Sequence, residues 1–269
     1  MAIELSGIRL VVSDIDGTLV KNDKSLAPET VEAVRRVRAA GIGFTIISAR
    51  PPSGLGPLIA ELGLDGPAGA FNGATIFRPG GEVVEAHHID EDAARGIVAI
   101  HDRLGIPVWV FADGRWMTRT REMPHVDQEI VAARQDPVVT PDFERWMSRA
   151  DKVQGISDDS DLLTKAEDEL KASVGERATI ARSQHYYLDA TAPHTDKGHG
   201  VRELAKAFGV PLEAVAVLGD MPNDLPMFRV AGVSVAMGQA PDEVKAEADQ
   251  ITKSNEDNGV AAFLEFLGK

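Results

Sequence analysis

Two short apolar runs that stop abruptly at polar residues constrain the fold more than any other feature of the sequence. The run Ile8–Ser13 ends at Asp14, and the run Ile42–Ile47 ends at Ser48. Such runs are typical of strands that are buried on both faces of a parallel sheet. Between them, residues 28–41 have the apolar spacing of an amphipathic helix, with proline at its start and glycine after its end. The stretch therefore predicts a strand–helix–strand unit.

The alternation continues at both ends of the chain. A second helix is predicted to follow Pro51-Pro52 and to end near Gly63, and a third strand is predicted from Ala70 to Phe77. The C-terminal part predicts helices at 197–208, 224–231 and 241–248 and from Val260, with strands at 215–218 and 233–237. Strands alternating with helices indicate parallel βαβ units. We therefore predict an α/β fold with a doubly wound, Rossmann-like parallel sheet.

The middle of the chain has a different pattern. It contains a predicted hairpin, turned near Asp113-Gly114, and a mixture of other strands and helices; the hairpin strands are 108–111 and 115–118, the helices 91–104 and 161–173, and the other strands 152–156 and 186–190. A segment of roughly 110 residues is long enough to form its own core. We predict a catalytic core at 1–82 and 191–269, interrupted by an inserted α+β domain at 83–190.

Composition limits the classes of partner. Among 269 residues, 42 are acidic and 28 basic, which gives a formal net charge of -14. Such a surface disfavours nonspecific binding to nucleic acid or to an anionic membrane. The absence of cysteine rules out disulfides and thiolate metal sites, and neither a signal peptide nor a membrane-spanning run is seen. We expect a cytoplasmic protein with a small-molecule partner, either a monomer or a small homo-oligomer.

Polar residues follow three of the predicted strands. Asp14, Ser48 and Asp220 come directly after or near such strands, Lys197 opens a helix, and Asp16 lies two residues beyond the first strand end. Ligands of open α/β sheets bind at this edge. Two carboxylates about 4 Å apart repel by roughly 4 kcal/mol at an effective dielectric near 20. A divalent cation removes this repulsion, and oxygen ligands with open positions suit Mg²⁺.

The same residues suggest a reaction. The Asp14 carboxylate can attack phosphorus and form an aspartyl-phosphate, which divides hydrolysis into two steps. Asp16 can protonate the leaving group, but a free Asp with a pKa of about 3.9 is protonated only about once in a thousand at pH 7. We therefore expect burial or a neighbouring anion to raise the pKa of Asp16. Gly17 would let the backbone wrap a phosphate closely, and Thr18 would cap the turn.

Four ordered motifs carry a family resemblance that spans nearly the whole chain. They are Asp14-Ile15-Asp16-Gly17-Thr18, Ile47-Ser48-Ala49-Arg50, Lys197-Gly198 and Gly219-Asp220-Met221-Pro222-Asn223-Asp224. Two further segments, 71–74 and 255–260, match as well. The sequence resembles the haloacid dehalogenase superfamily of phosphatases, in the Cof-like branch with a large α/β cap (subfamily IIB). The inserted domain has the position and size of that cap.

The resemblance implies a role for each motif residue. Asp14 is implied as the nucleophile, Asp16 as the acid–base residue, and Ser48 and Lys197 as catalytic holders of the phosphoryl group. The Mg²⁺ ligands are implied to be Asp14, Asp16 through its backbone carbonyl, and Asp220. Asp224 is implied to steer Lys197 or a metal-bound water. Substrate contacts are implied for Asn72, Gly73, Arg50 and Asn223, although Arg50 taken alone is better explained as a structural or rim residue.

The main function hypothesis is hydrolysis of a small phosphate monoester, such as a sugar phosphate or related metabolite. The alternative is a phosphomutase that moves phosphate between hydroxyls. Its cap would have to exclude water and hold a second phosphate, which predicts extra basic residues in the cap; the cap offers Arg95, Arg103, Arg115, Arg119 and Arg121. A signalling receiver also uses Asp, Mg²⁺ and Lys. Asp16 and the large insertion argue against a receiver, which needs neither a leaving-group acid nor a cap.

Two other patterns have simpler explanations. His87-His88 resembles a metal-binding pair but lacks the i, i+4 spacing of a helical site, so a solvated strand edge is the better interpretation. Trp109, Phe111 and Trp116 alternate in the predicted hairpin. They are best explained as core residues of the cap, with room for one of them to face the active site.

Overall fold

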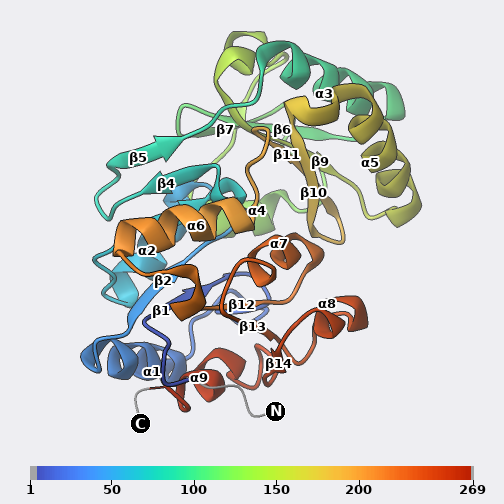
Figure 1. Ribbon diagram of the computed structural model, residues 1–269. Coiled ribbons are helices and arrows are strands. Elements are labelled where there is room, and N and C mark those ends of the chain that lie inside the picture. Colours follow the sequence, from blue (N-terminus) through green and yellow to red (C-terminus); the bar gives the residue numbers. More distant parts are fainter. Residues whose placement is uncertain (1–4, 268–269) are drawn as a thin grey trace.

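The computed structural model describes residues 5–267 and has two parts with separate sheets (Figure 1). A five-stranded sheet lies at the bottom of the view and a six-stranded sheet at the top. None of the helices in the described part of the chain combines the length and the apolar character needed to cross a membrane.

The lower sheet is parallel throughout and has the order β14-β13-β12-β1-β2. Its strands are β1 (Leu10–Ser13), β2 (Gly43–Ile46), β12 (Val215–Gly219), β13 (Val233–Ala236) and β14 (Gln250–Ile251). In this order β1 lies between β2 and β12, with Ser13 opposite both Ile46 and Leu218. The carboxyl ends of these three strands are therefore level. The residues that follow them must converge, as the sequence predicted.

Helices cover both faces of this sheet, which confirms the doubly wound α/β prediction. On one face, Val11 of β1 packs with α1 (Pro28–Ala39) and α9 (Gly259–Leu264). On the other face, Leu10 and Val12 pack with α6 (Lys197–Phe208), α7 (Leu225–Phe228) and α8 (Asp242–Ala246). Alternate residues of one strand thus enter two separate cores, which explains why the strand is apolar along its whole length.

The predicted third strand, Ala70–Phe77, is wrong as a single strand. It forms two antiparallel strands, β3 (Ala68–Ala70) and β4 (Thr75–Phe77), joined by a tight turn at Phe71–Gly73. All three turn residues have positive φ, so the chain reverses where the apolar pattern suggested it would continue. The helix before it, α2 (Pro52–Glu61), was predicted correctly.

The upper sheet has the order β10-β11-β9-β6-β7-β8. Its strands are β6 (Val108–Ala112), β7 (Arg115–Thr118), β8 (Val138–Val139), β9 (Ala150–Ile156), β10 (Thr179–Gln184) and β11 (Tyr187–Thr191). The predicted hairpin is β6–β7, with Phe111 opposite Trp116. Neither β10 nor α4 (Val126–Ala133) was predicted, because neither has a long apolar period.

The two faces of the upper sheet have different neighbours. One face packs on α3 (Glu91–Leu104) and α5 (Ser160–Val174), with Val110 and Val153 in that cluster. Trp109, Phe111 and Trp116 lie on the other face and pack with the cluster of the lower part, where the Phe111 ring lies 5.9 Å from the Phe71 ring. These aromatics join the two parts rather than filling the interior of the upper one.

The domain boundaries at 83 and 190 stay a prediction. The outermost residues of the predicted core, 1–4 and 268–269, lie outside the described residues. All six strands of the upper sheet lie within 83–191. At the first boundary, however, β5 (Val83–Ala86) pairs with β4 in a small three-stranded sheet. The first connection into the upper part, which we call the cap, therefore begins as a strand anchored to the lower part, which we call the core.

Candidate active site

Asp14 follows β1 and forms a buried ion pair with Lys197, the first residue of α6. Lys197 Nζ lies 2.6 Å from Asp14 Oδ1 and 2.5 Å from Asp224 Oδ1, and all three side chains are buried. The second oxygen of Asp224 accepts hydrogen bonds of 2.8 Å from the backbone N–H groups of Asp220 and Met221. Asp224 therefore orients both Lys197 and the loop after β12.

Asp220 brings a further carboxylate to this group. Its Oδ1 accepts a hydrogen bond of 2.9 Å from the Thr18 hydroxyl, so Thr18 orients Asp220 and does not cap the turn as predicted. Gly17 has φ +79°, and a Cβ there would lie 2.3 Å from Asp220 Oδ2. Glycine is needed because the Asp220 carboxylate occupies that space.

The carboxylates of Asp14, Asp220 and Asp224 form a cluster suited to a cation. Each offers an oxygen within 4.8 Å of the other two, and all three are buried. Burial raises the pKa of Asp14 to about 7 against the opposing charge of Lys197. Burial, with Asp224 and Asp14 nearby, also raises the pKa of Asp220. One lysine does not balance three buried carboxylates, and an all-oxygen donor set fits Mg²⁺.

Asp16 is surrounded by two cations, whereas burial or a neighbouring anion was expected from the sequence. Arg50 Nε and Nη2 each lie 2.7 Å from one of its carboxylate oxygens, and Lys24 Nζ lies 2.6 Å away. Burial would raise the pKa of Asp16, but Arg50 and Lys24 outweigh it and hold the pKa well below its usual range. The expectation of a raised pKa was wrong for this state, because two cations face the carboxylate.

Ser48 and Arg50 come from the loop after β2. Ser48 is buried, and its hydroxyl accepts a hydrogen bond of 3.2 Å from the backbone N–H of Arg50. Arg50 is only 6% exposed, and its Nη1 also reaches the Ala132 carbonyl of α4 at 3.4 Å. Arg50 is therefore a buried link between Asp16 and the cap, not a rim residue.

The Asn72-Gly73 turn lies beside the same group. Asn223 Nδ2 donates to Asn72 Oδ1 at 3.1 Å, and Asn72 Nδ2 donates to Asp189 Oδ2 of the cap at 3.4 Å. Gly73, with φ +92°, packs on the first turn of α6, where a Cβ would lie 2.8 Å from Gly200 Cα. The structure thus gives Gly73 a packing role, while the two asparagines lie next to the residues predicted to be catalytic.

A cavity of about 50 Å³ lies between core and cap. From the core it is lined by Asp14, Asp16, Lys24, Ser48, Ala49, Arg50, Lys197 and Asn223. From the cap it is lined by Gln128, Glu129, Ala132, Lys152, Gln154, Ser183, Gln184, Tyr186 and Tyr187. The four residues predicted to be catalytic therefore line one cavity, with the cap on its other side.

The cap residues of this cavity were not predicted. Lys152 is 2% exposed, with its Nζ 3.1 Å from the Ala49 carbonyl, 4.0 Å from Asp189 Oδ1 and 4.3 Å from the centre of the Phe111 ring. Burial raises the pKa of Glu129 to about 7, with Lys152 opposing. The available signal was a lysine and a glutamine, Gln154, at alternate positions of the predicted strand 152–156, which is otherwise apolar.

The cap arginines that the phosphomutase alternative needed lie elsewhere. Arg95 pairs with Glu91 and Glu144, Arg103 with Glu169, Arg119 with Asp102 and Arg121 with Asp136, all on exposed surface, and Arg115 is also exposed. Of the described cap residues that line the cavity, Lys152 is the one with a positively charged side chain. The expected basic cluster is therefore not at the site.

A family model described as haloacid dehalogenase-like hydrolase matches residues 11–264. The chain belongs to the haloacid dehalogenase-like hydrolase family. This membership confirms the resemblance that the four motifs carried, and with it the prediction of an enzyme of the phosphatase type. The match covers both core segments and the cap between them.

Named relatives and solved structures agree with this family. The chain is 28% identical to the 5-amino-6-(5-phospho-D-ribitylamino)uracil phosphatase YwtE of Bacillus subtilis, over 97% of this chain and 98% of the relative. It is 28% identical to the pyridoxal phosphate phosphatase YbhA of Escherichia coli, over 95% and 97%. A haloacid dehalogenase-like hydrolase from Bacteroides thetaiotaomicron superposes with a TM-score of 0.84 at 27% identity, over 96% and 98%. The subclass IIB sugar phosphatase BT4131 gives 0.83 at 26%, over the same shares.

Proposed function

We propose that this protein hydrolyses a small phosphate monoester, with Mg²⁺, through an aspartyl-phosphate on Asp14. The observation that carries the proposal is the buried ion pair of Asp14 with Lys197, next to Asp220, at the base of a cavity that the cap covers. A nucleophilic carboxylate, a fixed cation and a cation-binding carboxylate pair are the groups that phosphoryl transfer to a protein oxygen requires.

Asp14, Asp220 and the backbone carbonyl of Asp16 would hold Mg²⁺. The pKa values of Asp14 and Asp220, raised first by burial, support a cation there, because a cation would favour their ionised forms. When bound, Mg²⁺ supplies positive charge that offsets the charge of the phosphoryl group and of the carboxylates around it.

In the first step, an oxygen of Asp14 forms a bond to phosphorus as the bond from phosphorus to the ester oxygen breaks. Lys197 and Ser48 hold the oxygens of the phosphoryl group, and Asp16 gives its proton to the departing alkoxide. A phosphate that enters beside Arg50 and Lys24 competes with Asp16 for these cations. Asp16 then loses the partners that hold its pKa low, which favours the protonated form that the step needs.

In the second step, water attacks the phosphorus of the aspartyl-phosphate. Asp16, now ionised, takes a proton from this water, and the bond between phosphorus and the Asp14 oxygen breaks. Inorganic phosphate leaves and the Asp14 carboxylate is restored. Lys197 is positioned for both steps because Asp224 fixes its ammonium group from the other side.

The cap side of the cavity favours a polyhydroxylated or similarly polar leaving group. Gln154 donates to Asp189 at 2.6 Å, while its Oε1 is buried and has no hydrogen-bond partner among the described residues. A buried acceptor without a donor is costly, and a substrate hydroxyl would satisfy it. Lys152 and Ser183 line the same wall. A sugar phosphate or a related metabolite fits this chemistry, in keeping with the substrates in the names of BT4131 and YwtE.

The central test is a panel of phosphorylated metabolites assayed with Mg²⁺ and with EDTA. We expect turnover of at least one ester that EDTA abolishes and Mg²⁺ restores. The variant Asp14→Asn should show no turnover, because an amide is a poor nucleophile and a poor Mg²⁺ ligand. Asp65→Asn, which changes an exposed carboxylate paired with Arg38, is the matched control and should keep wild-type turnover. Turnover that survives EDTA or Asp14→Asn would contradict the proposal.

A second test isolates the role of Asp16 by varying the leaving group. Alkyl phosphates need a proton on the departing oxygen, whereas p-nitrophenyl phosphate releases a stable phenolate. Asp16→Asn should therefore slow an alkyl phosphate much more than p-nitrophenyl phosphate. Equal losses on the two esters would show that Asp16 acts in some other way.

A further inference from the structure

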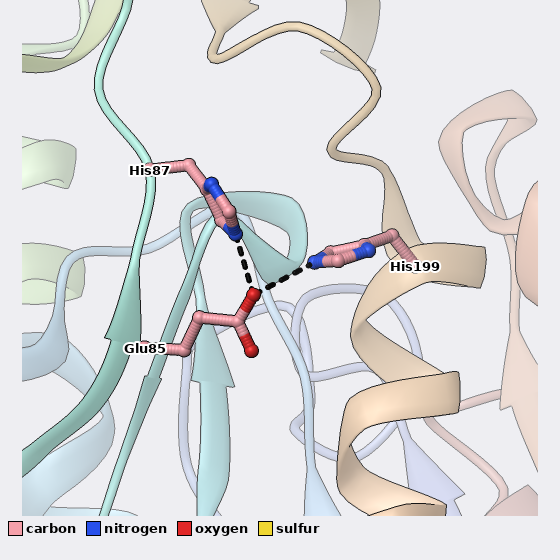
Figure 2. Close-up of side chains that lie close together, drawn as sticks. All are labelled: Glu85, His87 and His199. Carbon is pink, nitrogen blue, oxygen red and sulfur yellow. Dashed lines mark hydrogen bonds and ion pairs between the residues drawn. The ribbon is translucent and has the colours of Figure 1, made fainter.

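A second group of metal-ligating side chains lies away from the active site, where the first connection into the cap meets helix α6. Figure 2 shows Glu85 and His87 on one side and His199 on the other, with their polar atoms turned toward one another. One ligand atom from each of the three lies within 4.8 Å of the other two. We propose that these residues form a binding site for a divalent ion of the zinc class.

Local structure explains why the three side chains meet. Glu85 lies in β5, and the backbone N–H of His87 extends the pairing by bonding to the Ala74 carbonyl at 2.9 Å. Residues two apart on an extended chain project to the same side, so Glu85 and His87 both face α6. His199 is in the first turn of α6, where the Asp196 side chain caps its backbone N–H at 2.8 Å.

The distances between the ligand atoms would allow one ion to bind with little movement of the side chains. His87 Nε2 lies 2.5 Å from Glu85 Oε1, and His199 Nε2 lies 3.7 Å from the same oxygen. Ligands bound to one Zn²⁺ at about 2.0–2.1 Å lie roughly 3.3 Å apart in a tetrahedron. Both separations are within about 0.8 Å of this spacing, and one nitrogen of each imidazole lies within 4.8 Å of the other, so small side-chain rotations would complete the site.

The polar atoms of the group are incompletely satisfied without a cation. His199 Nε2 is buried and has no hydrogen-bond partner among the described residues, although it points toward Glu85. Glu203, one turn along α6 from His199, brings a second carboxylate near Glu85. Two neighbouring carboxylates and an imidazole nitrogen that makes no hydrogen bond form a donor set that a cation would satisfy.

The donor set selects the kind of ion. Two imidazoles and a carboxylate are the ligands of many zinc sites, with a fourth position left for water or another carboxylate. Imidazole also suits other late first-row ions, whereas Mg²⁺ takes oxygen ligands. The buried oxygen cluster at Asp14 and the histidine group should therefore bind different metals.

An ion at this place would link the strand that leads into the cap to a helix of the core. β5 leads into the cap, and α6 begins with Lys197, two residues before His199. An ion held by Glu85, His87 and His199 would tie the first connection into the cap to the helix that carries the active-site lysine. This tie would oppose any motion that separates the two elements.

The test is titration of untagged full-length protein with Co²⁺, in excess Mg²⁺ to fill the oxygen cluster. We expect one Co²⁺ per chain with the strong visible absorption of a tetrahedral site, displaced by Zn²⁺. His87→Ala and His199→Ala should each weaken binding by more than the roughly 10- to 100-fold typical of losing an outer-shell partner. His88→Ala is the matched control, since its side chain is similarly exposed but pairs with Asp151 of the cap, and it should bind normally.

Three results would overturn the proposal. They are the absence of Co²⁺ binding to folded wild-type protein, equal binding by wild type and both histidine variants, and a signal lost in Asp14→Asn but kept in His87→Ala and His199→Ala. The last result would place the ion at the oxygen cluster. Circular dichroism and thermal unfolding of each variant confirm that it is folded. Because binding is read directly, the outcome is independent of whether any phosphate ester is hydrolysed.

Discussion

The cavity has one wall of core residues, the core wall, and one wall of cap residues, the cap wall, and the two hold their polar groups in different ways. On the core wall, Asp14 lines the cavity and Asp220 lies next to it, both in loops at the carboxyl ends of neighbouring parallel strands. Lys197 fixes Asp14, and Asp224 fixes both Lys197 and the backbone of Asp220. On the cap wall, Lys152 and Gln154 project from the middle of strand β9, where Gln154 donates to Asp189 of β11. The core groups are at an edge determined by topology, whereas the cap groups occupy one face of a sheet. We infer that the core wall performs chemistry common to all substrates and that the cap wall selects among them.

The largest expected effect tests the core wall. Lys197→Met removes the cation between Asp14 and Asp224, so the phosphoryl group loses a fixed positive charge. We expect kcat to fall by about 10²- to 10³-fold, and by a similar factor for every ester in the panel. Steady-state kinetics on at least three esters would check this. A loss that varied strongly with the leaving group would break the proposed division between the two walls.

The matching change on the cap wall is Lys152→Met. A hydrogen bond to a charged group contributes about 1.5–3 kcal/mol, so kcat/KM should fall by roughly 10- to 100-fold for the esters that contact Lys152. Esters that do not reach it should lose little, so the order of preference within the panel should change. A uniform loss across the panel would mean that Lys152 acts on the phosphoryl group itself.

Glu129 makes the cap wall sensitive to pH. Its folded pKa of about 7 lies above the ordinary value of 4.5, so ionisation costs stability as the pH rises from about 4.5 through 7. Glu129→Gln cannot ionise, and its free energy of unfolding relative to wild type should rise over this range by about 1–3 kcal/mol. Urea denaturation at pH 5 and pH 8 measures the change. The exposed Glu122→Gln is the control, and a flat difference for Glu129→Gln would contradict the prediction.

The smallest expected effect concerns the backbone of the core wall. Gly17→Ala and Gly41→Ala place a side chain at similar φ values of +79° and +83°, but only Gly17 has Asp220 where the Cβ would go; no heavy atom lies within 4 Å of a Cβ at Gly41. Backbone strain should cost each variant about 1 kcal/mol of stability, and Gly17→Ala should lose more than Gly41→Ala because its Cβ displaces Asp220. Gly17→Ala should in addition raise the Mg²⁺ concentration needed for half-maximal turnover. Equal Mg²⁺ dependence in the two variants would show that Asp220 can move without consequence.

The parts that sequence analysis predicted well share a physical origin. β1, α1, α6 and the hairpin β6–β7 have strong apolar periods or clear start and stop residues, which act locally. The family, too, was evident from four ordered motifs. The prediction of one strand at Ala70–Phe77 failed because an apolar pattern does not reveal a reversal made by three residues with positive φ.

The predictions about the pKa of Asp16 and about side-chain partners were wrong for a different reason. The pKa of Asp16 depends on Arg50, which is 34 positions away, and on Lys24, and their carboxylate contacts exist only in the folded chain. Thr18 was expected to cap a local turn, but its partner Asp220 is 202 positions away. The pair His87-His88 was interpreted from its own spacing, whereas the nearest imidazole to His87 outside that pair comes from His199. Charges and ligands assemble across distances that a single motif does not contain.

The sequence by itself determined the α/β architecture and the set of residues that meet at the carboxyl edge of the sheet, because the strand ends follow from local patterns and alternating strands and helices form a parallel sheet. Only the tertiary structure decided which cap side chains face these residues, which cations hold Asp16, and that Glu85 and His87 meet His199. These depend on how two sheets and a helix pack together. The packing is a property of the whole chain, and one charged side chain buried in an apolar strand gives no sign of which surface it will face.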